Sequence, residues 1–160
     1  MDPSTLLFTA ILAFLPISEL RGAIPYATAR GVDLLTAALV GTALNALVPL
    51  IAYAFLSTVH KLLYRLVVYR GFFDRFVEKA RRKVHEKVEK YGYWGLLVFV
   101  AIPLPVTGAW TGTLGAWILG MDRKKSILAI AGGVIVAGII VSFLVALLGS
   151  GARSIFLKYI

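Results

Sequence analysis

Two long stretches without a charged residue limit what this chain can fold into. They run from Leu34 to Leu56 and from Ser126 to Gly149, and each exceeds the roughly 20 apolar residues that a helix needs to cross a bilayer. Of the 160 residues, 59% are hydrophobic and 16% are charged, whereas a soluble domain has about 25% charged residues. We therefore predict an all-α integral membrane protein with transmembrane helices at 34–56 and 126–149.

Each long stretch is preceded by an apolar segment that proline interrupts. A helix over residues 6–15 rises about 15 Å, which reaches the middle of a hydrocarbon layer about 30 Å thick. There the chain meets Pro16, Glu19 and Arg21, and a straight span would hold a helix breaker and two charges in lipid. The second segment meets Pro103 at a similar depth. We predict re-entrant helical hairpins at 6–30 and 94–119, with tips shielded by protein or water.

The two halves of the chain resemble each other. When the sequence is aligned with itself so that Leu15 falls on Leu104, Leu-Pro-Ile-Ser pairs with Leu-Pro-Val-Thr, and Gly31-Val-Asp pairs with Gly120-Met-Asp. Internal symmetry with interrupted apolar segments in matching places is typical of transporter folds. We predict two inverted repeats, 1–57 and 93–150, each a re-entrant hairpin followed by a transmembrane helix, and a C-terminal tail at 151–160.

Most of the net charge of +9 lies in the connector between the repeats, residues 58–92. Lys and Arg outnumber Asp and Glu there, and apolar residues recur near helical spacing at Phe73, Phe76, Val77, Val84 and Val88. This pattern predicts a basic amphipathic helix on the anionic inner leaflet. Nucleic-acid binding is the alternative, but cytoplasmic loops of membrane proteins commonly carry such a bias, so we expect no nucleic-acid partner.

The distribution of charge also predicts the orientation. If both hairpins return to the side from which they entered, the connector and the loop 122–125 share the cytoplasmic face, and both termini lie outside. Four full spans would place Arg123, Lys124 and Lys125 outside. The apolar stretch 4–18 has no preceding Lys or Arg and no nearby cleavage pattern, so we expect it in the mature protein. We expect a multi-pass protein of the plasma membrane, with both connector histidines, His60 and His85, in water.

Several functions are disfavoured by what the sequence lacks. It has no cysteine, which rules out disulfides and thiol chemistry. It also has no phosphate-binding loop, no His-Glu-x-x-His, no Gly-x-Ser-x-Gly and no carboxylate cluster for Mg²⁺. We therefore expect no enzyme, no cofactor and no metal site. ATP-driven transport by this chain alone is excluded, which leaves an ion gradient or passive exchange.

Two motifs carry a resemblance to a known family. The stretch Ser18-Glu-Leu-Arg-Gly-Ala-Ile-Pro-Tyr-Ala27, followed by Pro103-Leu-Pro-Val-Thr-Gly-Ala-Trp-Thr-Gly112, resembles the small multi-drug export protein family over nearly the whole chain. That family looks like a compact relative of the DedA or VTT superfamily, which has opposed re-entrant hairpins with a membrane-embedded acid and arginine. DedA proteins are associated with flipping of lipid phosphates and with proton-dependent drug tolerance. By this resemblance, Glu19 matches the acidic position and Arg21 a basic one.

The candidate site centres on these two charges, because ionisable groups at membrane depth are functional candidates by default. Glu19 is the candidate proton carrier, and the planar fork of Arg21 suits a phosphate or carboxylate. The alternative is that they merely pair with each other or with hairpin carbonyls. The further candidates for binding substrate or protons are Ser18, Pro16, Pro25, Pro103, Pro105, Thr107, Gly108, Trp110, Thr111 and Asn45.

These features lead to two hypotheses. The first is a secondary transporter or flippase for amphiphilic substrates, either lipid phosphates or drugs, coupled to protons through Glu19. It would work among membrane lipids as a homodimer, because two spans and two half-spans give little area to shield polar hairpin tips. The second is a non-transporting membrane scaffold whose basic connector recruits acidic lipids or a protein partner. A scaffold does not need the charge pair of Glu19 and Arg21.

Overall fold

The computed structural model describes residues 1–104 and 107–158, and within these ranges every regular element is a helix. This confirms the all-α prediction. The helices are α1 (Pro3–Phe14), α2 (Glu19–Ala29), α3 (Leu34–Ala46), α4 (Val48–Ser57), α5 (Val59–Leu63), α6 (Val67–Ala101), α7 (Ala109–Ile118) and α8 (Arg123–Lys158).

Two stretches of helix in the described part are long and apolar enough to cross a membrane. They are Leu34–Ser57, with 24 residues, and Arg123–Gly149, with 27 residues, and they coincide with the two uncharged runs. The first consists of α3 and α4, which join at Leu47 just before Pro49. Proline has no backbone N–H to donate, so the helix is interrupted there. Many large apolar side chains of both stretches are exposed, which is expected of a surface that faces lipid.

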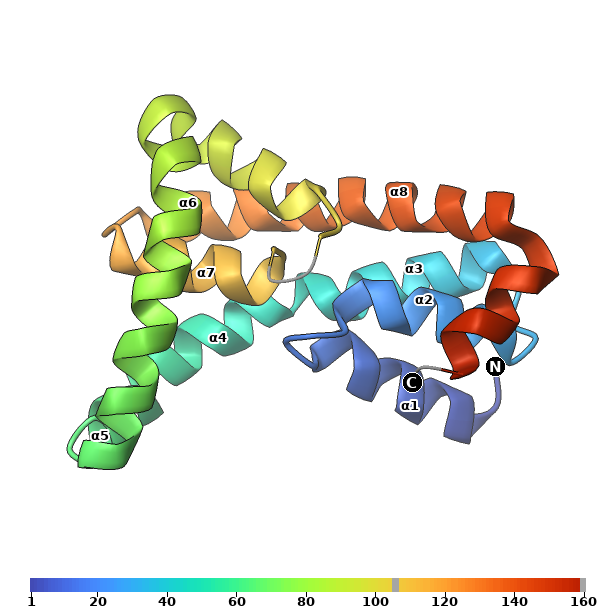
Figure 1. The fold of residues 1–160 in the computed structure, drawn as a ribbon, viewed down its shortest axis with the longest axis horizontal. Helices are drawn as coiled ribbons and strands as arrows, with labels where there is room; N and C mark the ends of the chain where they lie inside the picture. Colours follow the sequence, from blue (N-terminus) through green and yellow to red (C-terminus); the bar gives the residue numbers. More distant parts are fainter. Residues whose placement is uncertain (105–106, 159–160) are drawn as a thin grey trace.

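Helices α1 and α2 pack against each other as a hairpin with its turn at residues 15–18. The side chain of Asp2 caps α1 by accepting a hydrogen bond from Thr5 N at 2.8 Å. A second hairpin is formed by α7 and the part of α6 that follows Gly92, where the backbone leaves the helix with φ +57°. Figure 1 shows the two turns pointing toward one another near the middle of the molecule, from opposite ends.

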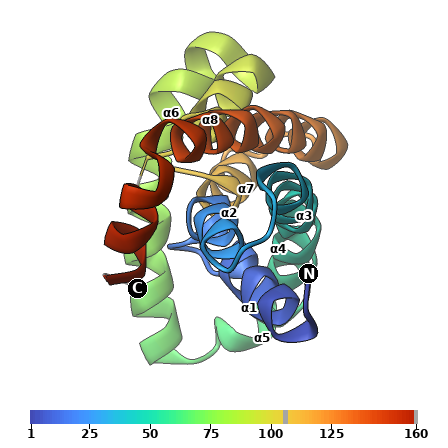
Figure 2. The same cartoon turned by 90° about the vertical axis from the view of Figure 1, so that its right-hand side faces the viewer.

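The long helices surround the two hairpins. Helix α8 packs on α2, α6 and α7, while α3 contacts α2 and α4 contacts α7. In Figure 2, α8 crosses above α2 and α7, and α3 and α4 lie along their side. Gly133 brings α8 close to α6, because a Cβ at that position would lie 2.6 Å from the carbonyl oxygen of Leu97. The core contains Ile24, Leu96, Ile130 and other buried residues from all these layers, so helices of both hairpins belong to one packed body.

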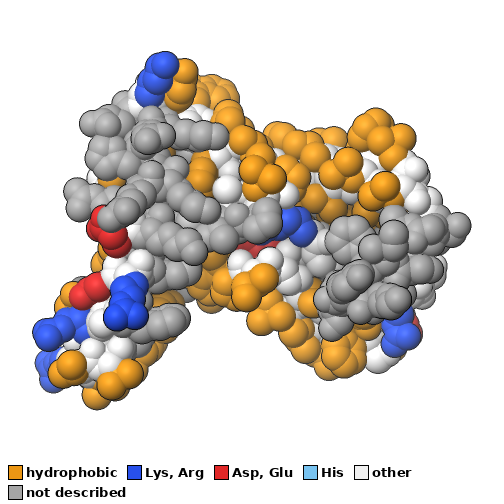
Figure 3. All heavy atoms as spheres, in the orientation of Figure 1, with side chains coloured by type: hydrophobic (Ala, Val, Ile, Leu, Met, Phe, Trp, Pro, Cys, Tyr) orange, Lys and Arg blue, Asp and Glu red, His pale blue; other side chains and the backbone are white. Residues whose placement is uncertain are grey.

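The connector crosses the end of the molecule at which α8 begins (Figure 1). Most of the charged side chains that are visible in Figure 3 gather at this end, while hydrophobic side chains cover much of the remaining surface. The apolar face of the amphipathic helix is partly covered by protein, because Phe73 and Val77 pack against Leu56 and Leu114. The side chains of Phe76 and Val84 lie outside the described part.

The expectation that His60 lies in water is wrong. Its side chain is buried, and its residue is 7% exposed. The imidazole lies 4.1 Å from the ring centroid of Phe73 and 5.4 Å from that of Trp117. These rings come from α6 and α7, so the burial depends on tertiary contacts that the charged local sequence does not reveal. The side chain of His85 lies outside the described residues.

Candidate functional site

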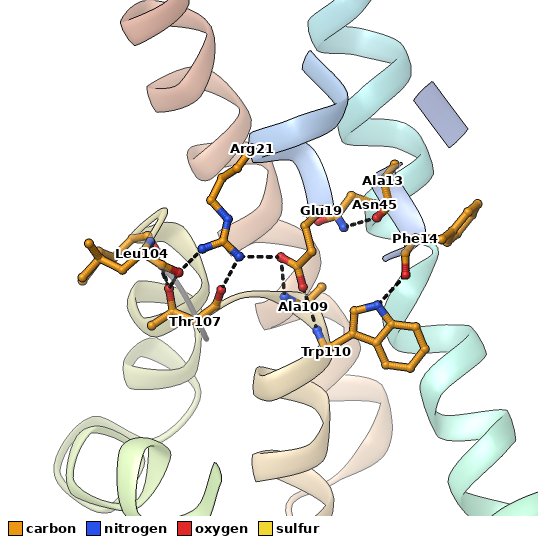
Figure 4. Close-up of polar contacts among 10 residues, drawn as sticks. Ala13, Phe14, Glu19, Arg21, Asn45, Leu104, Thr107, Ala109 and Trp110 are labelled. Carbon is orange, nitrogen blue, oxygen red and sulfur yellow. Dashed lines mark hydrogen bonds and ion pairs between the residues drawn. The ribbon is translucent and has the colours of Figure 1, made fainter. Parts of the chain in front are cut away.

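The side chain of Glu19 joins the two hairpins. Glu19 is the first residue of α2, and it is 3% exposed. Its carboxylate accepts hydrogen bonds from the backbone N–H groups of Ala109, at 3.4 Å, and Trp110, at 3.2 Å. These groups open α7, and the first N–H groups of a helix have no partner within it. The acid of the first hairpin therefore caps a helix of the second, where the positive end of the helix dipole stabilises an anion (Figure 4).

Gly108 provides the space for this carboxylate. A Cβ at Gly108 would lie 2.7 Å from Cδ of Glu19, closer than non-bonded carbons approach. The backbone of Gly108 has φ +145°, a region that is essentially restricted to glycine. Two constraints thus require glycine at this position, namely its backbone conformation and the space that the carboxylate of Glu19 occupies.

Arg21 extends from the same helix to the turn of the second hairpin. Its guanidinium donates to the carbonyl oxygens of Leu104 and Thr107, the latter at 3.0 Å, and Nη2 lies 3.6 Å from Oε2 of Glu19. The Oγ1 atom of Thr107 lies 2.7 Å from the carbonyl oxygen of Ile102 and accepts a hydrogen bond from Leu104 N at 3.1 Å. The turn is therefore ordered from within by Thr107 and from the other hairpin by Arg21.

The second hairpin also reaches back to the first. The indole Nε1 of Trp110 donates to the carbonyl oxygen of Phe14 at 2.9 Å, and Nδ2 of Asn45 donates to that of Ala13 at 2.8 Å. Both carbonyls lie at the end of α1, where the helix leaves them without partners of its own. Figure 4 shows these contacts beside those of Glu19 and Arg21. Each hairpin turn is therefore stabilised by side chains from outside it.

Two further polar atoms near the first turn are buried. Within the described part of the chain, Oγ of Ser18 and Oδ1 of Asn45 have no hydrogen-bond partner. A buried polar atom without a partner costs about 1–3 kcal/mol. Both atoms therefore keep an unused capacity to accept a hydrogen bond.

The remaining candidate residues are divided between the turns and the helices. Pro16 is exposed in the first turn and Pro103 is half-buried in the second. Thr111 is buried near the start of α7. Pro25 is buried in the interior of α2, away from the residues where the two hairpins meet. Pro105 lies outside the described residues.

The contacts of the two charges match the alternative given above, because Glu19 and Arg21 pair with each other and Arg21 binds carbonyls of the second hairpin. The N–H groups of Ala109 and Trp110 are the partners that the side-chain pattern did not identify. A signal was present, because a glycine that precedes a helix after a proline-containing turn exposes N–H groups suited to an anion. In the described residues, no group of three or more His, Cys, Asp or Glu side chains could hold a metal ion.

Comparison with known proteins identifies a family. The model of the family described as "Putative small multi-drug export protein" matches residues 19–140. This range begins at Glu19 and includes the whole second hairpin. No curated protein and no solved structure matches the chain. The export description and the two apolar helices agree on a membrane protein.

Proposed function

The chain belongs to the small multi-drug export protein family, and on this basis we propose that it is a secondary transporter of amphiphilic substrates that is coupled to protons through Glu19. The observation that carries the proposal is the position of this acid. Glu19 is buried where the hairpin turns meet, and its carboxylate contacts the backbone of the opposite hairpin. A proton on that carboxylate changes the contacts of both hairpins at once.

Protonation weakens the junction between the hairpins. Hydrogen bonds to an ionised acceptor are about twice as strong as those between neutral groups, and protonation removes the charge that the N–H groups of α7 and the guanidinium of Arg21 face. The junction is then held mainly by the bonds from Arg21 and Trp110 to carbonyls. We propose that this weakened state lets the turns separate and exposes the site to substrate.

An anionic substrate fits the groups that no longer face a negative charge once Glu19 is protonated. The guanidinium of Arg21 and the N–H groups at the start of α7 suit a phosphate or a carboxylate. A lipid phosphate would replace the carboxylate while Glu19 holds a proton, so anion and proton travel in the same direction.

A cationic drug would use the ionised form of Glu19. It would displace the proton and travel against it, which is the coupling expected of drug export. The two substrate classes therefore predict opposite directions of pH-driven flux, and a transport assay separates them.

The proposal includes the arrangement in the membrane. Helix α1 has 12 residues and rises about 18 Å, too short for a layer of about 30 Å. The opposed turns in Figure 1 support two re-entrant hairpins that enter from opposite faces, as in an inverted repeat of the DedA type. The exposed cations Arg123, Lys124 and Lys125 lie at the same end as the connector, which supports a cytoplasmic position for that end of a multi-pass plasma-membrane protein.

We also propose that the transporter is a homodimer. Ile17 in the first turn is 92% exposed and Leu104 in the second is 56% exposed. Non-helical backbone at the middle of a membrane must be covered by protein or face a water-filled cavity. A second copy packed over the turns would provide this cover.

The decisive test is transport in vesicles that contain the purified protein, with an imposed pH gradient. The probes are ethidium as a cationic amphiphile and a fluorescent short-chain lipid phosphate. We expect the Glu19→Gln variant to show the pH-driven flux of protein-free vesicles, because Gln keeps the volume of the side chain but does not take up or release a proton. The control is Asp33→Asn, which makes the same acid-to-amide change at an exposed cap of α3, where Asn also caps helices well.

Full pH-driven flux in Glu19→Gln would remove the proton-carrier role. If the melting temperature of this variant fell while its flux remained, Glu19 would be a structural tie between the hairpins; only the absence of flux in the wild-type protein would favour the non-transporting scaffold. The Arg21→Ala variant refines the result. We expect it to reduce the flux of the lipid phosphate more than that of ethidium, since Arg21 faces the anion.

A further inference from the structure

Two grooves flank Trp94 at the base of the second hairpin. The first has a volume of about 340 Å³ and lies between α6 and α8. Its lining residues are Tyr93, Trp94, Leu97, Lys125, Leu128 and Ala129. The second has a volume of about 310 Å³ and lies on α6, lined by Tyr91, Trp94, Gly95 and Val98. Trp94 lines both grooves and is 75% exposed.

Each groove has an apolar wall with a cation beside it. The Nζ atom of Lys125 lies 5.9 Å from the ring centroid of Tyr93, and that of Lys90 lies 5.3 Å from the ring centroid of Tyr91. The nearby acid Asp122 is engaged as a helix cap, because its carboxylate accepts from Lys125 N at 2.9 Å. Tyrosine and tryptophan next to lysine are typical of the level of lipid headgroups. The grooves therefore combine surfaces for hydrocarbon with positive charge for phosphate.

We propose that these grooves bind one anionic phospholipid of the cytoplasmic leaflet. Its phosphate lies near Lys125 and Lys90, and its two acyl chains lie on the two sides of Trp94. The positive charge favours an anionic headgroup over a zwitterionic one. This lipid is a bound component, distinct from any substrate, and its site does not include Glu19.

Such a lipid would hold the base of the hairpin that carries the site. Leu97 and Leu128 come from α6 and α8, so a chain in the first groove contacts both helices. The same junction is fixed on its polar side by the hydroxyl of Tyr93, which accepts a hydrogen bond from Asp122 N at 3.1 Å. The lipid and this hydrogen bond together would set the position of the second hairpin relative to α8.

The test uses quenching of tryptophan fluorescence by lipids with brominated acyl chains. The protein is reconstituted into phosphatidylcholine vesicles that contain an equal fraction of either brominated phosphatidylglycerol or brominated phosphatidylcholine. The difference between the wild-type protein and Trp94→Phe gives the signal of Trp94, without altering Trp110 or Trp117. We expect Trp94 to be quenched more by the anionic lipid than by the zwitterionic one.

Two lysine variants identify the source of this preference. Lys125→Gln should reduce it, because only Lys90 then remains beside the grooves. Lys124→Gln should preserve it, because Lys124 is exposed in the same first turn of α8 but does not line the grooves. Glu19→Gln should also preserve it, so that failure of this proposal and failure of the proton-carrier role remain distinguishable.

Three results would overturn the proposal. The first is equal quenching of wild-type Trp94 by the two lipids. The second is an equal loss of preference in Lys124→Gln and Lys125→Gln, which would indicate a general effect of surface charge. The third is absence of quenching by either lipid, since the grooves would then be covered by protein.

Discussion

Gly108 and Glu19 occupy complementary positions, because the carboxylate of Glu19 fills the space that a side chain at Gly108 would need. The two residues belong to different hairpins, and the contact lies at the start of α7. The small size of Gly108 thus determines where the carboxylate of Glu19 can lie. This relationship connects packing to the proposed transport mechanism, and it can be tested by adding a single methyl group.

Gly108→Ala should lower both stability and transport. The substitution forces a Cβ into the carboxylate, and overpacking of this kind typically costs about 1–3 kcal/mol. The matched control is Gly120→Ala. Gly120 has φ +64°, but a Cβ added there would meet no neighbouring atom within 4 Å. The loss of stability in Gly120→Ala therefore reflects backbone conformation alone and is about 1–2 kcal/mol. Thermal unfolding in detergent should show the larger loss for Gly108→Ala, and equal losses would mean that Glu19 moves aside freely.

Trp110→Phe should destabilise the junction by removing one hydrogen bond. The indole of Trp110 donates to the carbonyl oxygen of Phe14, and a typical hydrogen bond contributes about 0.5–1.5 kcal/mol. Trp117→Phe is the control, because Trp117 contacts His60 and Phe73 through its ring, and phenylalanine keeps a ring. Unfolding temperatures of the two variants are compared in one detergent. A larger loss for Trp117→Phe would contradict the importance of the bond to Phe14.

Single introduced cysteines should form two groups, according to the side of the membrane from which they can be labelled. The natural chain has no cysteine, so each introduced thiol is the only one that a membrane-impermeant maleimide can label. Asp2→Cys and Asp33→Cys should react from outside intact cells, whereas Arg70→Cys and Lys124→Cys should react only after permeabilisation. All four positions are exposed. Reaction of Lys124→Cys from outside would contradict the re-entrant hairpins.

A cysteine at the first hairpin turn should cross-link two copies. Ile17 is 92% exposed, and in the proposed homodimer the turns lie near the interface. Oxidation of Ile17→Cys in membranes should give a covalent dimer on non-reducing gels. Leu39→Cys is the control, because Leu39 is 62% exposed on α3, a surface that we expect to face lipid. Equal cross-linking at both positions would point to random collision.

The melting temperature should fall in mild acid because of His60. Burial lowers the pKa of His60, and the carboxylate of Asp74 partly opposes this effect. The unfolded chain, in which histidine titrates near about pH 6.5, then binds the proton more readily than the folded chain. The stability is therefore present above about pH 6.5 and is lost as the pH falls toward the lowered pKa. The difference in melting temperature between about pH 7.5 and pH 5.5 should be smaller in His60→Phe, which keeps a ring but does not titrate.

The sequence predicted the helices well where length and proline decide the outcome. Helix α1 ends at Phe14, next to residue 15, where the predicted first half of the hairpin ends. A run of apolar residues has few alternatives to a helix, and proline ends it for local steric reasons. The interruption at Pro49 follows from the same property.

The contacts between helices were less accessible to prediction. Glu19 and Arg21 were singled out as candidates, and hairpin carbonyls were considered as their partners. The N–H groups that bind Glu19 were not, because every residue other than proline has such a group and no side-chain pattern marks it. His60 was assigned to water because it lies in the basic connector, yet rings from α6 and α7 bury it. Such contacts depend on how distant segments pack, and a local pattern does not contain that information.

The fit between Glu19 and Gly108 also bears on how a protein of this kind can evolve. In the self-alignment that pairs Leu15 with Leu104, Glu19 falls on Gly108 and Arg21 falls on Trp110. An assembly of two identical halves must carry the same residue at both positions, so two glutamates would compete for one space, or two glycines would leave no acid. This chain holds different residues at the two positions, so the contact between the acid and the glycine depends on a difference in sequence between its two halves.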